Sequence, residues 1–120
     1  MSAPRAIIAE QYLHVAVLSS LPEMASVLID CGAEIDAKKT DGATPLHLVS
    51  NIGYVETAKM LMARGANINA KNGYGETPLH LAAKSIQTEI ARLLIARGAD
   101  IDAEIFFSRI CWYLSFLDAQ

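Results

Sequence analysis

Apolar residues in the middle of the chain lie at helical spacing in two short stretches. The first stretch follows Thr44, a good N-cap residue, and Pro45, which suits the first position of a helix. Its apolar side chains are those of Leu46, Leu48 and Val49. Gly53 can take the left-handed conformation that ends a helix. The pattern therefore predicts a short first helix between Thr44 and Gly53.

A second helix is predicted from about Val55 to Arg64. Its apolar stripe consists of Val55, Ala58, Leu61 and Met62. Gly65 is the expected stop, and residues 66–73 then alternate polar and apolar around turn-forming residues, as a projecting hairpin-like loop would. A helix pair this short cannot bury its apolar stripe alone, so neighbouring pairs must stack.

The two-helix unit recurs at an offset of 33 residues. Residues 39–71 and 72–104 are identical at 15 of 33 positions, and a weaker copy occupies residues 6–38. The recurring residues are Thr44, Pro45, Leu46 and His47, then Thr77, Pro78, Leu79 and His80, and the unit-ending Gly32, Gly65 and Gly98. A fixed period of this length is the signature of a repeat architecture.

These units resemble the ankyrin repeat over about 99 of the 120 residues. The family pattern D-G-x-T-P-L-H-L-A-A-x-x-G matches residues 41–53 and 75–83, and its ending L-L-x-x-G-A-D-V-N-A matches 61–70 and 94–103. The resemblance implies an all-α solenoid of stacked helix-turn-helix units with projecting β-turn or hairpin loops. We expect a single domain over residues 1–120, in which residues 105–120 form a degenerate half-repeat or a tail.

The repeated histidines do not suit a metal site. Equivalent positions in stacked helices lie ~8–10 Å apart, whereas zinc needs its nitrogen ligands within about 2.1 Å. The resemblance instead implies that His47 and His80 bind threonine and neighbouring backbone as framework residues. Asp36, Asn69 and Asp102 occur one per turn, where such residues bind local backbone. We expect no catalytic residue, no metal and no cofactor, and hence no enzyme.

The charge, the apolar stretches and the cysteine content disfavour several other classes of protein. A net charge of −3 and a pI near 5.5 disfavour nucleic-acid binding, which needs an excess of Lys and Arg. The longest apolar stretch, residues 105–117, falls short of the ~20 residues that cross a bilayer. Two distant cysteines form no disulfide framework, and no signal-peptide pattern is present. We therefore expect a cytoplasmic protein without membrane insertion.

The resemblance implies that the chain binds another protein through a concave face and its projecting fingers. Contacts are expected at the finger tips and at the exposed end of each first helix. Those positions are Thr40, Asp41, Ala43, Asn51, Ile52, Gly73, Tyr74, Glu76, Lys84 and Ser85. Tyr74 is the expected anchor, because an aromatic residue at a turn tip is not required by local folding.

Several alternatives stay open from sequence alone. The chain is interpreted either as a binding module, as an inhibitor or adaptor that occludes an enzyme, or as a fragment of a longer ankyrin array. The aromatic-rich residues 105–117 suit a helical cap, a frame-disrupted end, or an apolar patch for a partner or for self-association.

Ile86 departs from the repeat, because it stands where the preceding unit has Gly53. A β-branched residue resists the left-handed conformation that glycine adopts there. Ile86 is therefore expected either to adopt that conformation under strain or to lie in a rearranged loop in which it packs inward. The polar neighbours Ser85 and Gln87 favour the second alternative.

Overall fold

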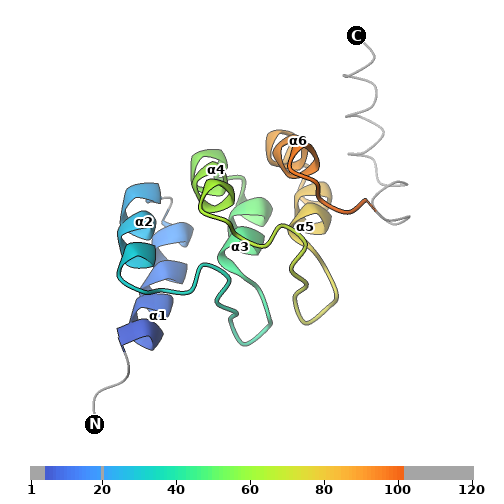
Figure 1. Cartoon of the computed structure of the whole chain (residues 1–120). Coiled ribbons are helices and arrows are strands. Elements are labelled where there is room, and N and C mark those ends of the chain that lie inside the picture. The colour runs from blue at the N-terminus through green and yellow to red at the C-terminus, as the bar shows by residue number, and fades with distance from the viewer. Residues whose placement is uncertain (1–4, 20, 102–120) are drawn as a thin grey trace.

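The computed structural model describes residues 5–19 and 21–101, with side chains from Tyr12 onward. This part of the chain contains six helices and no strand. They are α1 (Arg5–Leu18), α2 (Pro22–Asp30), α3 (Pro45–Ile52), α4 (Val55–Ala63), α5 (Pro78–Lys84) and α6 (Thr88–Ala96). The helix pairs stand in a row, with α1, α3 and α5 in one layer and α2, α4 and α6 in the other (Figure 1). This arrangement confirms the predicted all-α solenoid of stacked pairs.

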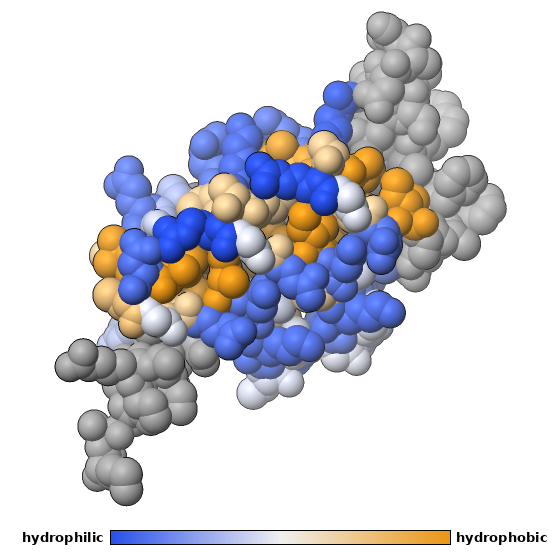
Figure 2. Space-filling model, in the orientation of Figure 1, coloured by the Kyte–Doolittle hydropathy of each residue, from blue (hydrophilic) through white to orange (hydrophobic). Residues whose placement is uncertain are grey.

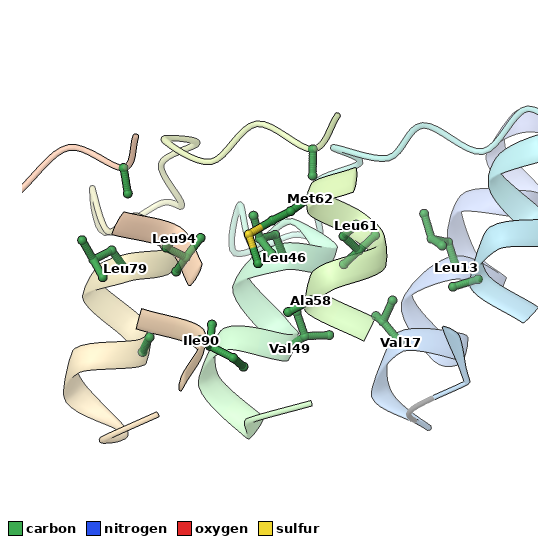
Figure 3. Close-up of a cluster of buried hydrophobic side chains, with 14 of the residues drawn as sticks. Leu13, Val17, Leu46, Val49, Ala58, Leu61, Met62, Leu79, Ile90 and Leu94 are labelled. Atoms are coloured by element: carbon green, nitrogen blue, oxygen red, sulfur yellow. The ribbon is translucent and has the colours of Figure 1, made fainter. Parts of the chain in front are cut away.

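One continuous apolar core runs through all three pairs. Its largest fully buried members include Leu13, Leu46, Leu61, Leu79, Ile90 and Leu94. Val17 points from α1 toward the second pair, and alanines such as Ala58 let neighbouring helices approach closely (Figure 3). Because each stripe is covered by the next pair, the hydrophobic burial that stabilises the fold lies largely between repeats.

Polar side chains add a second set of links between repeats. The Asp36 carboxylate accepts a hydrogen bond from the Asn67 backbone N–H at 2.9 Å, and the Asn69 side chain accepts one from the Asp100 N–H at the same distance. Sequence reasoning predicted local turn bonds for Asp36 and Asn69, yet both of these bonds cross to the following repeat. Asp102 lies outside the described residues.

A further link joins the second helices of repeats 1 and 2. Arg64, at the C-terminus of α4, donates to the Ser26 hydroxyl at 2.7 Å and forms an ion pair with Asp30. The chain then turns at Gly65, where φ is 90°, as it does at Gly32 (106°) and Gly98 (91°). These left-handed residues end each unit and redirect the backbone toward the next one.

Repeat 1 lacks a finger, contrary to the register of the repeat. The register places Ile8 at the tip position that Asp41 and Tyr74 occupy later, but Ile8 lies inside α1, which starts at Arg5. Residues 6–11 contain no Gly, Asp or Asn to form a turn and are mostly helix formers. The first helix therefore continues through the segment that folds into a finger elsewhere.

The expected inward packing of Ile86 is wrong. Ile86 has a φ of 55° and is 66% exposed. Its polar neighbours face repeat 2 instead: the Ser85 hydroxyl donates to Asn51 Oδ1 at 2.7 Å, and Gln87 Nε2 donates to the Ile52 carbonyl at 3.2 Å. These bonds hold the loop in the same left-handed geometry as Gly53 and turn Ile86 toward solvent.

Replacing Ile86 with glycine should therefore stabilise the protein. The change relieves left-handed strain and loses little buried area, while the more flexible unfolded chain offsets part of the gain. We expect the free energy of unfolding, measured by urea denaturation, to rise by up to ~1 kcal/mol. Ile52→Gly, at the helical C-terminus of α3, is the matched control and should lower it. A destabilised Ile86→Gly protein would contradict this account.

The predicted cap or tail at residues 105–120 lies outside the described residues. The part of the chain that the structure describes forms one row of helix pairs (Figure 1).

Candidate functional site

Two fingers project from the same edge of the row, one before α3 and one before α5 (Figure 1). Each is a tight turn closed by backbone hydrogen bonds. Gly42 N–H donates to the Lys39 carbonyl at 2.8 Å, and Gly75 N–H donates to the Asn72 carbonyl at 3.0 Å. The tips are thus residues 40–41 and 73–74. All four tip residues are exposed, and the surface along this edge is largely hydrophilic in Figure 2.

The two fingers touch each other through backbone. Gly73 N–H donates to the Asp41 carbonyl at 2.8 Å. A Cβ on Gly73 would lie 2.9 Å from that carbonyl oxygen, and a Cβ on Gly42 would lie 2.6 Å from Gly73 N. Only glycine permits so close an approach at these positions. Gly73, a predicted contact residue, therefore also couples the fingers into one rigid edge.

Tyr74 stands on the tip of the second finger and is 82% exposed. The turn beneath it is held by Asn72, whose side-chain oxygen accepts from the Tyr74 N–H at 2.9 Å and from the Glu76 N–H at 3.0 Å. Such Asx turns fix the backbone without any contribution from the tyrosine ring. The fold therefore presents an aromatic side chain that it does not itself use.

An open hollow of about 440 Å³ lies beside Tyr74, lined also by Gly75, Glu76 and Lys84. Lys84 reaches back along α5 to form an ion pair with Glu76. That bond lowers the pKa of Glu76, with smaller contributions from the Asn72 side chain and opposition from burial. The structure thus brings together three predicted contact residues, Tyr74, Glu76 and Lys84.

The other predicted contact residues divide into two groups. Asn51 and Ser85 bind each other at the far ends of α3 and α5, beside the exposed Ile52. Thr40 and Asp41 are exposed at the first tip, but Ala43 is only 6% exposed. Its N–H donates to Asp41 Oδ1, and its carbonyl accepts from Lys39, so Ala43 closes the turn. Ala43 therefore belongs to the closed base of the turn and offers a partner little surface.

Two residues that shape the site, Asn72 and Gly75, are absent from the predicted contact set. A signal for them exists in the sequence. Asn-Gly-Tyr-Gly has asparagine at the first and glycine at the fourth position, which is typical of a type I turn. The predicted contact set contained only the positions that the resemblance implies for contact, so it did not include Asn72 and Gly75, which form the turn beneath the tip.

The base of the second finger is anchored by a histidine of the preceding repeat. His47 is fully buried, and its Nε2–H donates to the Glu76 carbonyl at 2.8 Å. Because a carbonyl only accepts, Nδ1 of the neutral ring must be the acceptor. The Thr44 N–H (3.1 Å) and hydroxyl (2.8 Å) both donate to it, while Thr44 Oγ1 accepts the His47 N–H.

The same capping box recurs at the start of α5. The Thr77 N–H donates to His80 Nδ1 at 2.9 Å, and Thr77 Oγ1 accepts from the His80 N–H. Pro45 and Pro78 occupy the first helical positions, and Leu46 and Leu79 are buried beneath them. In repeat 1, His14 Nε2 donates to the Ala37 carbonyl at 3.1 Å. The three histidines thus act at the joints between helices and loops.

A comparison with models of protein families shows to which family this chain belongs. A family model described as ankyrin repeats, in three copies, matches residues 13–105. The chain belongs to the ankyrin-repeat family. Ankyrin-repeat domains are typically non-catalytic modules that mediate protein–protein interaction. A sequence search of the curated proteins returned no match.

Two further findings concern the described part of this ankyrin chain. Among residues 5–19 and 21–101, no group of three or more His, Cys, Asp or Glu side chains is arranged to hold a metal ion. Over the same residues, none of the helices has the length and apolar character needed to span a membrane.

The His47 joint makes stability depend on pH. Burial lowers the pKa of His47 below 6.5, and the hydrogen bond to Glu76 offsets only part of this effect. The unfolded chain therefore binds a proton at His47 more readily than the native one does. The contribution of His47 to the free energy of unfolding is thus fully present above pH 6.5 and is lost as the pH falls below it. Protonation of Nδ1 would also turn the acceptor of both Thr44 bonds into a donor.

We expect the difference in unfolding free energy between the wild type and His47→Gln to shrink between pH 7.5 and pH 5. Other titrating groups affect both proteins, so the difference isolates the histidine. Urea denaturation at each pH, with an NMR titration of His47, measures it. A difference that stays constant or widens on acidification would contradict the lowered pKa of His47 in the folded protein.

Proposed function

We propose that this ankyrin chain is a non-catalytic module that binds another protein through its finger edge and the adjoining concave face. The observation that carries the proposal is Tyr74, whose exposed ring stands on a turn that Asn72 holds in place without it. Large aromatic side chains are enriched among the residues that dominate binding energy at protein interfaces.

The surroundings of Tyr74 support the same role. The adjacent hollow offers a partner an aromatic wall together with the Lys84–Glu76 pair, which can fix orientation through hydrogen bonds. The hydrogen bond between Gly73 and Asp41 links the two tips and so restricts their movement relative to each other before binding. A preorganised surface loses less conformational entropy on association, so more of its contact energy appears as affinity.

Tyr74→Ala should separate binding from folding. We expect it to weaken a cognate complex by more than ~1 kcal/mol, or about fivefold in Kd. Stability should move by less than about 0.5 kcal/mol, because the ring is exposed. Calorimetric titration and urea denaturation give the two quantities.

A partner is identified with a photo-crosslinking amino acid at position 74, and the same label at Glu56, on the outward part of α4, is the matched control. The label at 74, and not at 56, should yield a discrete product that excess wild type suppresses and excess Tyr74→Ala does not. Equal products from both positions, or equal competition by both proteins, would count against the proposed surface.

A further inference from the structure

The two fingers carry three lysine side chains whose positive charge no carboxylate of the described chain neutralises. Lys38 and Lys39 precede the first tip, Lys71 precedes the second, and all three are exposed. We call these three residues the lysine row. Among the residues that the structure describes, none of the three forms an ion pair. Although the whole chain has a net charge of −3, its finger edge therefore presents positive charge to solvent.

The lysine row lies at the bases of the fingers. Lys38 Nζ donates to the Lys71 carbonyl at 3.3 Å, so its ammonium group lies against the start of the second finger. Burial is the main cause of the lowered pKa of His47, and the positive charge of Lys38 adds to it, which places Lys38 near the start of α3. The Lys39 N–H donates to the Ala43 carbonyl at 2.9 Å and closes the first turn. The fold thus fixes where these lysines stand, while their charges stay available to a partner.

The carboxylates of the same two fingers are already engaged. Asp41 Oδ1 accepts a hydrogen bond from the Ala43 N–H at 3.0 Å, and Glu76 pairs with Lys84. The acidic groups at this hydrophilic edge (Figure 2) therefore bind within the chain, whereas the lysine row has no carboxylate to neutralise it. A partner that approaches the fingers meets net positive charge beside the ring of Tyr74.

We propose that the finger edge binds an acidic segment of another protein, whose carboxylates pair with the lysine row and whose apolar or aromatic side chain packs on Tyr74. This inference rests on the proposed function, because it names the chemistry of the partner for the same surface. Complementary charge speeds the encounter and fixes the register, while an aromatic anchor supplies more of the affinity. Three lysines on a chain of negative net charge are few for a phosphate backbone, which favours a protein over a nucleic acid.

The acidic groups of a second copy of this chain are poorly suited to the same site. In the residues described with side chains, the carboxylates that lie closest together in sequence are those of Asp30, Glu34 and Asp36. Asp30 pairs with Arg64, and the Asp36 carboxylate accepts the Asn67 N–H. Because two of the three are engaged within their own chain, a different protein is favoured as the source of the acidic segment.

A pair of synthetic peptides tests the charge requirement. The first alternates Glu and Ser around one central Trp, the second has Gln in place of each Glu, and both carry a fluorescent label. With the full chain at low ionic strength, we expect the Gln peptide to bind at least about fivefold more weakly than the Glu peptide. Added salt should reduce this difference. The Glu peptide should shift the NMR signals of backbone amides in residues 38–41 and 71–76.

Charge reversal in the lysine row tests the site. Lys71→Glu should weaken binding of the Glu peptide by about fivefold or more, because it reverses one charge and gives Lys38 a partner within the chain. Lys59→Glu, at an exposed position of α4, changes the net charge equally and should leave the affinity largely unchanged. Lys38→Gln, which leaves the second finger intact, should also weaken binding. Since all three positions are exposed, Tm should stay within about 3 °C of the wild type.

Equal or absent binding of the two peptides, or an equal loss with Lys71→Glu and Lys59→Glu, would overturn the acidic partner. The proposed function would still stand, because its own failure shows as equal cross-linking at positions 74 and 56. Tighter binding of a labelled single-stranded oligodeoxynucleotide than of the Glu peptide would assign the surface to nucleic acid. A concentration-dependent dimer in sedimentation that Lys71→Glu abolishes would assign it to a second copy of the chain. Either of these results would also overturn the proposal.

Discussion

The fold depends on one constraint: no helix pair of this chain can bury its own apolar stripe. Each pair is two short helices of seven to fourteen residues, and isolated helices of this length are marginal in water. The stripe of α4 becomes core only because repeat 1 lies against one side and repeat 3 against the other. Stability is therefore a property of the interfaces, in the manner of a one-dimensional array.

The same constraint fixes where polar groups act. Asp36 and Asn69 bind backbone of the following repeat, and His47 holds the base of the next finger through Glu76. These bonds set the spacing and rotation between units, while the apolar stripe supplies most of the stabilisation. The fingers inherit a rigid position from this scaffold. A turn tip such as Tyr74 can then carry a side chain selected for contact rather than for folding.

Much of this architecture could be predicted from the sequence, because a 33-residue offset and a Thr-Pro-Leu-His motif specify helix starts and ends locally. The start of α3 at Pro45 and the left-handed Gly53 follow from such local rules. What could not be predicted depends on contacts across repeats. Ile86 is exposed because its neighbours bind repeat 2, and Asp36 bonds forward rather than within its own turn.

The candidate site shows the same division. The exposure of Tyr74 follows from its place at a turn tip, but the coupling of Gly73 to Asp41 and the burial of Ala43 require knowledge of how two fingers lie together. Repeat 1 shows the same limit. The 33-residue register of the later units predicts a finger before Tyr12, but the sequence there has no turn-forming residue and folds as part of α1.

Propagation of a local defect tests the interface account most directly. Ile90 is buried on the face of repeat 3 that repeat 2 covers. Ile90→Ala should lower the free energy of unfolding by ~2–5 kcal/mol. Native-state hydrogen exchange, resolved by peptide, should then show faster exchange in α3 and α4 as well as in α5 and α6. Faster exchange confined to α5 and α6 would show that the repeats are stable independently, contrary to this account.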